Sequence, residues 1–143
     1  MKRFLALAFA AALTVTASAC QDSTNPGAVL SGTYTLRTVN DKSPPVVVFA
    51  DPTLTEEVIA GRITLDQSGN YTDIVTLRDT PTNGSPATTY DDQINGYWSL
   101  SGSQLTLTDV NDPTRPSYAT VRNGQLLFTN FSNGRSYTVV YSK

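Results

Sequence analysis

Few residues in this chain could carry chemistry, because histidine is absent and cysteine occurs once. Without histidine there is no Ser-His-Asp or Cys-His catalysis and no imidazole to bind a transition metal. Asp91 and Asp92 are neighbours on a predicted strand, so their carboxylates point to opposite faces and form no catalytic pair. The segment 109–112 begins like a calcium loop but lacks its glycine and distal glutamate. We therefore expect no enzyme, no catalytic residue, no metal and no cofactor.

The single cysteine, Cys20, follows a segment with the features of a secretion signal. Lys2 and Arg3 precede a mainly apolar run, Phe4–Val15, which is too short to span a hydrocarbon core of ~30 Å as a helix. Charge, a short apolar core and small residues before a cleavage point are typical of a signal peptide. Cleavage before Cys20 would leave a terminal thiol open to acylation. Ala17-Ser18-Ala19 also suits an ordinary signal peptidase, so a secreted protein with a free Cys20 is the alternative.

The stretch Ala17-Ser18-Ala19-Cys20 resembles the lipobox of bacterial lipoproteins. The resemblance implies lipidation of Cys20 with acyl chains such as palmitate, and two chains suffice for stable membrane anchoring. Gln21 follows the cysteine, and the sorting rules of Gram-negative lipoproteins then imply the outer membrane, with the protein facing the periplasm. The expected partners are thus a membrane, through the lipid anchor, and a small apolar ligand or another envelope protein.

Length and charge support one extracytoplasmic domain. We expect a signal peptide over 1–19, a lipidated cysteine and flexible tether over 20–30, and a folded domain over 31–143. Removing Lys2 and Arg3 from the 10 basic residues leaves 8 against 12 acidic ones, a net charge of −4. No basic cluster is present, which argues against nucleic-acid binding. One cysteine forms no internal disulfide, so the core and the strand ladders must hold the fold.

The folded domain reads as a series of short strands separated by turn residues. Asn123-Gly124 and Gln67-Ser68-Gly69-Asn70 are hairpin signals, and Gly96 suggests a bulge or bend within a long strand. Asp51–Glu56 suggests a helical turn. Sequential hairpins favour an antiparallel up-and-down β-barrel of about eight strands, because closure removes exposed edges. The predicted strands are Gly32–Val39, Val46–Phe49, Glu57–Asp66, Tyr71–Asp79, Ala87–Leu100, Gln104–Val110, Ser117–Arg122, Gln125–Phe131 and Arg135–Ser142.

Alternation along the strands predicts which side chains face the interior. The adjacent Ile74 and Val75 leave the register of their strand open, since both cannot point inward. Trp98 and Leu100 should pair with Leu107 and Leu105 across a hairpin. The predicted core is Tyr34, Leu36, Ile59, Ile63, Leu65, Trp98, Leu100, Leu105, Leu107, Leu126, Phe128, Tyr137, Val139 and Tyr141.

Three segments resemble bacterial lipocalin-like domains. They are the opening Gly32-Thr33-Tyr34, the strand and glycine turn Ile63–Tyr71 (ITLDQSGNY), and Gly96–Thr108 (GYWSLSGSQLTLT). The resemblance covers about residues 30–143. It implies a lipocalin-like barrel whose interior is either filled by side chains or hollow enough for one small ligand.

Two functions remain open from the sequence. In the first, the barrel binds a small apolar or amphipathic molecule; in the second, a filled barrel without a charged interior anchor presents its surface to an envelope protein. A void of ~300 Å³ or more, open at one end, would favour the first. Trp98 could line the ligand or simply pack the core, and the strand tyrosines Tyr34, Tyr71, Tyr90, Tyr137 and Tyr141 could offer hydroxyls or merely reflect β-propensity. The predicted ligand-facing residues are Tyr34, Leu36, Ile63, Trp98, Leu107, Phe128 and Tyr137.

Overall fold

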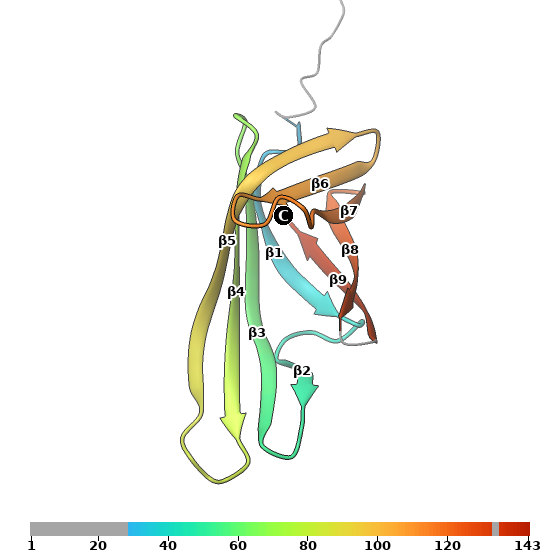
Figure 1. Ribbon diagram of the computed structural model, residues 1–143. Coiled ribbons are helices and arrows are strands. Elements are labelled where there is room, and N and C mark those ends of the chain that lie inside the picture. The colour runs from blue at the N-terminus through green and yellow to red at the C-terminus, as the bar shows by residue number, and fades with distance from the viewer. Residues whose placement is uncertain (1–28, 133–134) are drawn as a thin grey trace, which may run out of the picture.

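The computed structural model describes residues 29–132 and 135–143, which form one antiparallel sheet of nine strands (Figure 1). The predicted signal peptide, Cys20 and most of the predicted tether lie outside the described residues. The strands are β1 (Gly32–Val39), β2 (Val46–Ala50), β3 (Leu54–Leu65), β4 (Asn70–Pro81), β5 (Thr88–Ser101), β6 (Gln104–Asp109), β7 (Ser117–Arg122), β8 (Gln125–Ser132) and β9 (Arg135–Ser142).

The sheet closes into a barrel because β1 pairs with both β3 and β9 rather than with its chain successor β2. Residues 32–35 of β1 pair with β3, and residues 35–39 pair with β9. From β2 to β9, each strand pairs with the next along the chain. The result is a closed eight-stranded up-and-down barrel with β2 as an additional strand along the first half of β3. The predicted all-β fold and barrel are confirmed.

The predicted turns match local backbone chemistry. Asn123 and Gly124 have φ values of 51° and 74° between β7 and β8, as the type I′ hairpin turn requires. Between β3 and β4, the Asp66 carboxylate accepts hydrogen bonds from the Asn70 backbone N–H and the Ser68 hydroxyl, both at 2.8 Å. These turns fix the register of the long β3–β4 hairpin, in which Val75 takes the inward position and Ile74 the outward one.

One end of the barrel is filled by side chains. Tyr34, Leu65, Leu105 and Leu126 are at most 1% exposed there. The Tyr34 hydroxyl donates to the Leu30 carbonyl oxygen at 2.7 Å, and the Lys143 ammonium lies 5.1 Å from the Tyr34 ring centroid. Leu30, which the sequence placed in the tether, is therefore part of the core. We call this the closed end.

Two sequence expectations were wrong in detail. The pairing of β3 with β4 shifts between Val58 and Ala60, so Ile59 is an unpaired, half-buried bulge residue and Val58 takes the core position instead. The helical turn expected over Asp51–Glu56 is a tight turn in which the Asp51 carboxylate accepts hydrogen bonds from the backbone N–H groups of Thr53 and Leu54. Strand β3 then begins at Leu54.

Strands β3, β4 and β5 are longer than the others and extend past the barrel wall at the end opposite the closed end (Figure 1). Strand β5 pairs with β4 over residues 88–97 and with β6 over residues 96–101. The ladder with β6 on the other edge of β5 begins at Gly96, where an added Cβ would collide with the Thr108 carbonyl oxygen and the Tyr71 ring. The predicted bend at Gly96 thus marks a close approach of two backbones.

Within the described part of the chain, no helix is long and apolar enough to cross a membrane.

Candidate ligand-binding cavity

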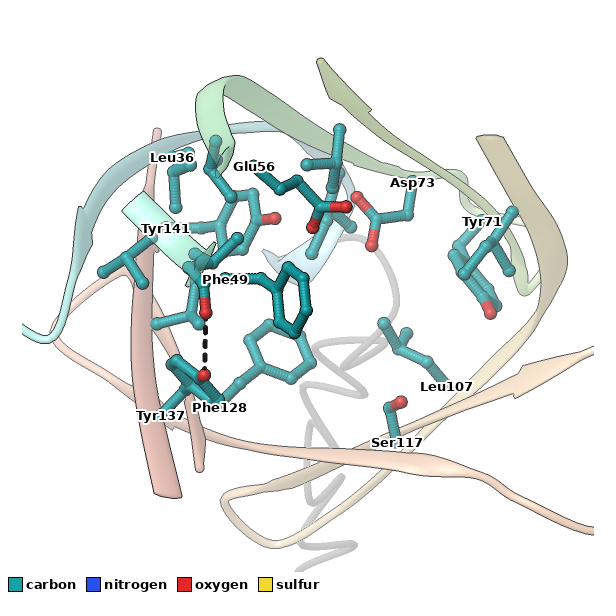
Figure 2. A pocket seen from close by; sticks show the side chains of 17 residues that line it. Leu36, Phe49, Glu56, Tyr71, Asp73, Leu107, Ser117, Phe128, Tyr137 and Tyr141 are labelled. Atoms are coloured by element: carbon teal, nitrogen blue, oxygen red, sulfur yellow. Dashed lines mark hydrogen bonds between the residues drawn. The ribbon is translucent and has the colours of Figure 1, made fainter. Parts of the chain in front are cut away.

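The barrel is hollow beyond its closed end. A cavity of about 360 Å³ lies between the filled layer and the extended part of β3–β5, and side chains from all nine strands line it (Figure 2). Its wall is mainly aliphatic and aromatic. Phe128 and Tyr141 meet edge to face there, with ring centroids 5.8 Å apart. Such a concave apolar space with a few polar groups is the usual form of a small-molecule site.

Five of the seven predicted ligand-facing residues line this cavity: Leu36, Ile63, Leu107, Phe128 and Tyr137. Tyr34 and Trp98 do not. Tyr34 lies at the closed end, outside the cavity, and its hydroxyl donates a hydrogen bond to the Leu30 carbonyl oxygen. Trp98 is half-buried beside the β3–β4 turn, where its indole N–H donates to the Asp66 carbonyl oxygen at 3.0 Å. Strand alternation gave both residues the correct face but could not give their depth along the barrel axis.

Strand β2 partly covers the cavity. Val48 and Phe49 of β2 both line it, and Figure 2 shows the Phe49 ring projecting toward its middle. The Tyr137 hydroxyl of β9 donates to the Val48 carbonyl oxygen at 2.9 Å. This bond fastens β2 across the gap between β3 and β9. Phe49 is still 38% exposed, so the cavity opens beside it, and we call that opening the mouth.

Asp73 is the polar group that stands out in the wall. Its side chain comes from β4, opposite Ile63 of β3 and Ile94 of β5. The Asp73 Oδ1 atom is buried and has no hydrogen-bond partner among the described residues. Burial, and then the negative charge of Asp92, raise the pKa of Asp73 to about 7. A carboxyl group in this position is protonated in roughly half of the molecules at neutral pH.

Glu56 supplies a second carboxyl group nearer the mouth. It lies on β3 opposite Asp79 of β4, and its side chain lines the cavity (Figure 2). Burial, followed by the charges of Asp79 and Asp92, raises the pKa of Glu56. Like charges directly opposite each other on a sheet are unfavourable. This end of the cavity is therefore a region of negative potential.

Two tyrosines add hydroxyl groups to the wall. Burial raises the pKa of Tyr71 to about 12, with smaller contributions from the negative charges of Asp109 and Asp73. Burial, and then Asp73, also raises the pKa of Tyr141. Both hydroxyls stay neutral at physiological pH and so act as hydrogen-bond donors or acceptors, not as bases.

Sequence reasoning missed Glu56 and Asp73, and the expectation of an interior without a charged anchor was wrong. The strand Tyr71–Asp79 did carry a signal, because Asp73 shares the parity of Tyr71 and Val75. Placing Val75 inward would have placed Asp73 inward as well. Glu56 could not be assigned in this way, since the bulge at Ile59 separates it from the regular half of β3.

Comparison with known proteins gives no relative to draw on: the sequence matches no protein-family model and no curated protein. The lipocalin-like and lipoprotein resemblances therefore stay predictions.

Proposed function

We propose that this protein is a non-enzymatic binding protein of the bacterial cell envelope that holds one small apolar or amphipathic molecule inside a lipocalin-like barrel. The observation that carries the proposal is the hollow interior. A volume of about 360 Å³ lies within the range of roughly 300–1,000 Å³ typical of ligand pockets. A filled barrel, which the alternative role as an interaction module assumes, would leave no such space.

Lipidation of Cys20 and attachment to the outer membrane belong to the same proposal and rest on the N-terminal sequence alone. The ligand would then be held at the end of a short tether, beside a membrane. Enzymatic turnover has little support, since the chain has no histidine and the cavity carboxyls have no partner arranged for acid–base work.

A pair of neighbouring residues on β4 provides the test. Val75 lines the cavity, whereas Ile74 lies on the outer face of the same strand. Val75→Trp should fill the cavity and reduce binding of the neutral fluorescent probe N-phenylnaphthylamine at least tenfold, while Ile74→Trp should leave probe binding near wild type. Circular dichroism would establish that both variants fold.

Two outcomes would contradict the proposal. Equal probe binding by wild type and folded Val75→Trp would place the probe outside the cavity. A complete lack of probe binding by wild type, together with no small molecule co-purifying in native mass spectrometry, would favour the interaction-module alternative.

A further inference from the structure

We propose that the ligand of this cavity carries a protonated amine that pairs with the Asp73 carboxylate, in the negative field of Glu56 and Asp92, while its apolar body fills the barrel. The inference rests on the proposed function, because it specifies the chemical class of the small molecule. Its basis is a set of inward-facing carboxyls without a lysine or arginine partner among the described cavity-lining residues.

The register of the long strands gathers carboxyl groups on the inner face. Alternation along β4 puts Asp73, Val75, Leu77 and Asp79 on one face. Glu56 is the β3 neighbour of Asp79, and Asp92 is the β5 neighbour of Val75. Four carboxyls thus share a face that runs from the cavity wall out through the mouth, separated by valine and leucine side chains.

Among the side chains that the structure describes, no lysine or arginine lies beside these carboxyls. None of the cavity-lining side chains in the described residues belongs to lysine or arginine. Arg78, the basic residue closest in sequence, lies on the outer face of β4 and is paired with Glu57 at 2.6 Å. Alternation keeps this ion pair on the opposite side of the sheet from Glu56 and Asp79. The charged side chains described in the cavity wall are therefore all acidic.

Asp73 is the carboxyl of this face that is best placed to bind the ammonium group of a ligand. Its Oδ1 atom is buried without a hydrogen bond among the described residues, which is unfavourable for an acceptor. The Asp79 Oδ1 atom is also buried and unpaired there, but Asp79 does not line the cavity. The apolar wall around Asp73 could have been completed by a valine or leucine at lower cost. Burial, and then the charge of Asp92, also raises the pKa of Asp73. An ammonium group would supply both a counter-charge and a hydrogen-bond donor.

Other classes of ligand are less compatible with the charges of this cavity. A carboxylate or phosphate ligand would meet repulsion from Asp73, Glu56 and Asp92. In the described part of the chain, no three acidic, histidine or cysteine side chains come together closely enough to hold a metal ion. A neutral alcohol could donate to Asp73 Oδ1 but would leave the charge uncompensated. An amine with an apolar body would pack against the apolar wall and pair with the Asp73 carboxylate.

Three probes with one chain length and different head groups test the inference: octylamine, octanol and octanoate, each titrated by isothermal calorimetry at pH 8. Wild type should bind octylamine about tenfold more tightly than octanol, and octanoate most weakly. Asp73→Asn keeps the shape of the side chain and should remove the preference for octylamine over octanol, leaving octanol affinity within twofold. Asp91→Asn removes an equal charge from the outer face of β5 and should change neither.

The pH dependence of wild type gives a readout without any substitution. The ionisable groups facing Asp73 are Glu56 on β3, Tyr71 on β4, Asp92 on β5 and Tyr141 on β9. Both tyrosines stay neutral between pH 5.5 and pH 8, because their pKa values are raised. Octylamine affinity should therefore fall about tenfold from pH 8 to pH 5.5 as Asp73 gains its proton, while octanol affinity should stay nearly constant.

The outcomes separate this inference from the proposed function. Equal binding of the three probes, or a preference for octanoate, would overturn the amine assignment and leave a binding barrel. An octylamine preference that survives in folded Asp73→Asn would move the cation site elsewhere and also overturn it. Failure of all three probes, together with failure of N-phenylnaphthylamine, would overturn the proposed function itself.

Discussion

At the scale of single residues, Asp73 sets this interior apart from an ordinary apolar core. It is surrounded by Ile63, Ile94 and Tyr71, and its Oδ1 atom is unpaired among the described residues. A carboxyl group placed in this way reduces stability unless a ligand compensates it. Proteins commonly accept such a loss at binding sites.

The stability of the ligand-free protein should therefore depend on the protonation of Asp73. The pKa of Asp73 rises from 3.8 to about 7 on folding, so the folded state holds the proton more tightly than the unfolded state. The free energy of unfolding should therefore fall as the pH rises from about 4 to about 7. Asp73→Asn should be more stable than wild type at pH 8, by on the order of 2 kcal/mol, and similar to it near pH 4.

Urea unfolding of both proteins at the two pH values measures this difference, with Asp91→Asn as the control for a general change in charge. A folded Asp73→Asn that is less stable than wild type at pH 8 would mean that the carboxylate has a stabilising partner in solution.

At the scale of elements, the cavity opens where β3 exchanges one neighbour for another along a single edge. Strand β3 pairs with β2 along its first half and with β1 along its second. Strand β5 pairs with β4 over residues 88–97 and, on its other edge, with β6 from Gly96 onward. Where β1 and β3 separate, β2 covers the gap and brings Phe49 to the mouth. The extended parts of β3–β5 place Glu56 in the cavity wall and Asp92 on the same face.

The start of the β5–β6 ladder depends on Gly96. Gly96→Ala would push a methyl group into the Thr108 carbonyl oxygen, a backbone atom that the β5–β6 ladder holds in place. We expect a loss of roughly 2–4 kcal/mol in the free energy of unfolding. Ser99→Ala, at an exposed position of the same strand, should change stability by less than about 0.5 kcal/mol. Thermal unfolding followed by circular dichroism compares the two, and equal midpoints would contradict the close approach.

At the scale of the whole molecule, the described part of the chain begins at the closed end, and the cavity opens at the other end. The Lys143 ammonium donates to the carbonyl oxygens of Val29 and Ser31 at 3.2 and 2.8 Å, so both ends of the described chain meet beside Tyr34. A tether from Cys20 would reach the barrel at this closed end. The mouth would then lie on the side of the domain away from the point of attachment.

The proposed anchor has a simple test. Cys20→Ser removes the thiol that acylation needs, so the variant should move from the membrane fraction to the soluble extracytoplasmic fraction. Immunoblotting of the two fractions measures this, and mass spectrometry of wild type should find diacylglycerol on Cys20. Retention of Cys20→Ser in the membrane fraction would contradict a lipid anchor.

Local patterns in the sequence determined the strands, the turns and most of the core. Period-two alternation and turn chemistry depend on residues a few positions apart, so they could be read without the fold. Trp98 with Leu107, Leu100 with Leu105, and the Asn123-Gly124 turn all occur as expected. The absence of histidine likewise restricts the available chemistry whatever the fold, because it is a property of composition.

The tertiary structure alone decided that the barrel is hollow and acidic inside. The volume depends on where β1 and β3 separate and on how β2 covers that gap, and neither follows from the sequence of one strand. Whether Asp73 faces solvent or the interior depended on choosing between Ile74 and Val75. That choice requires the neighbouring strands, because burial is a property of packed elements and not of one strand's sequence.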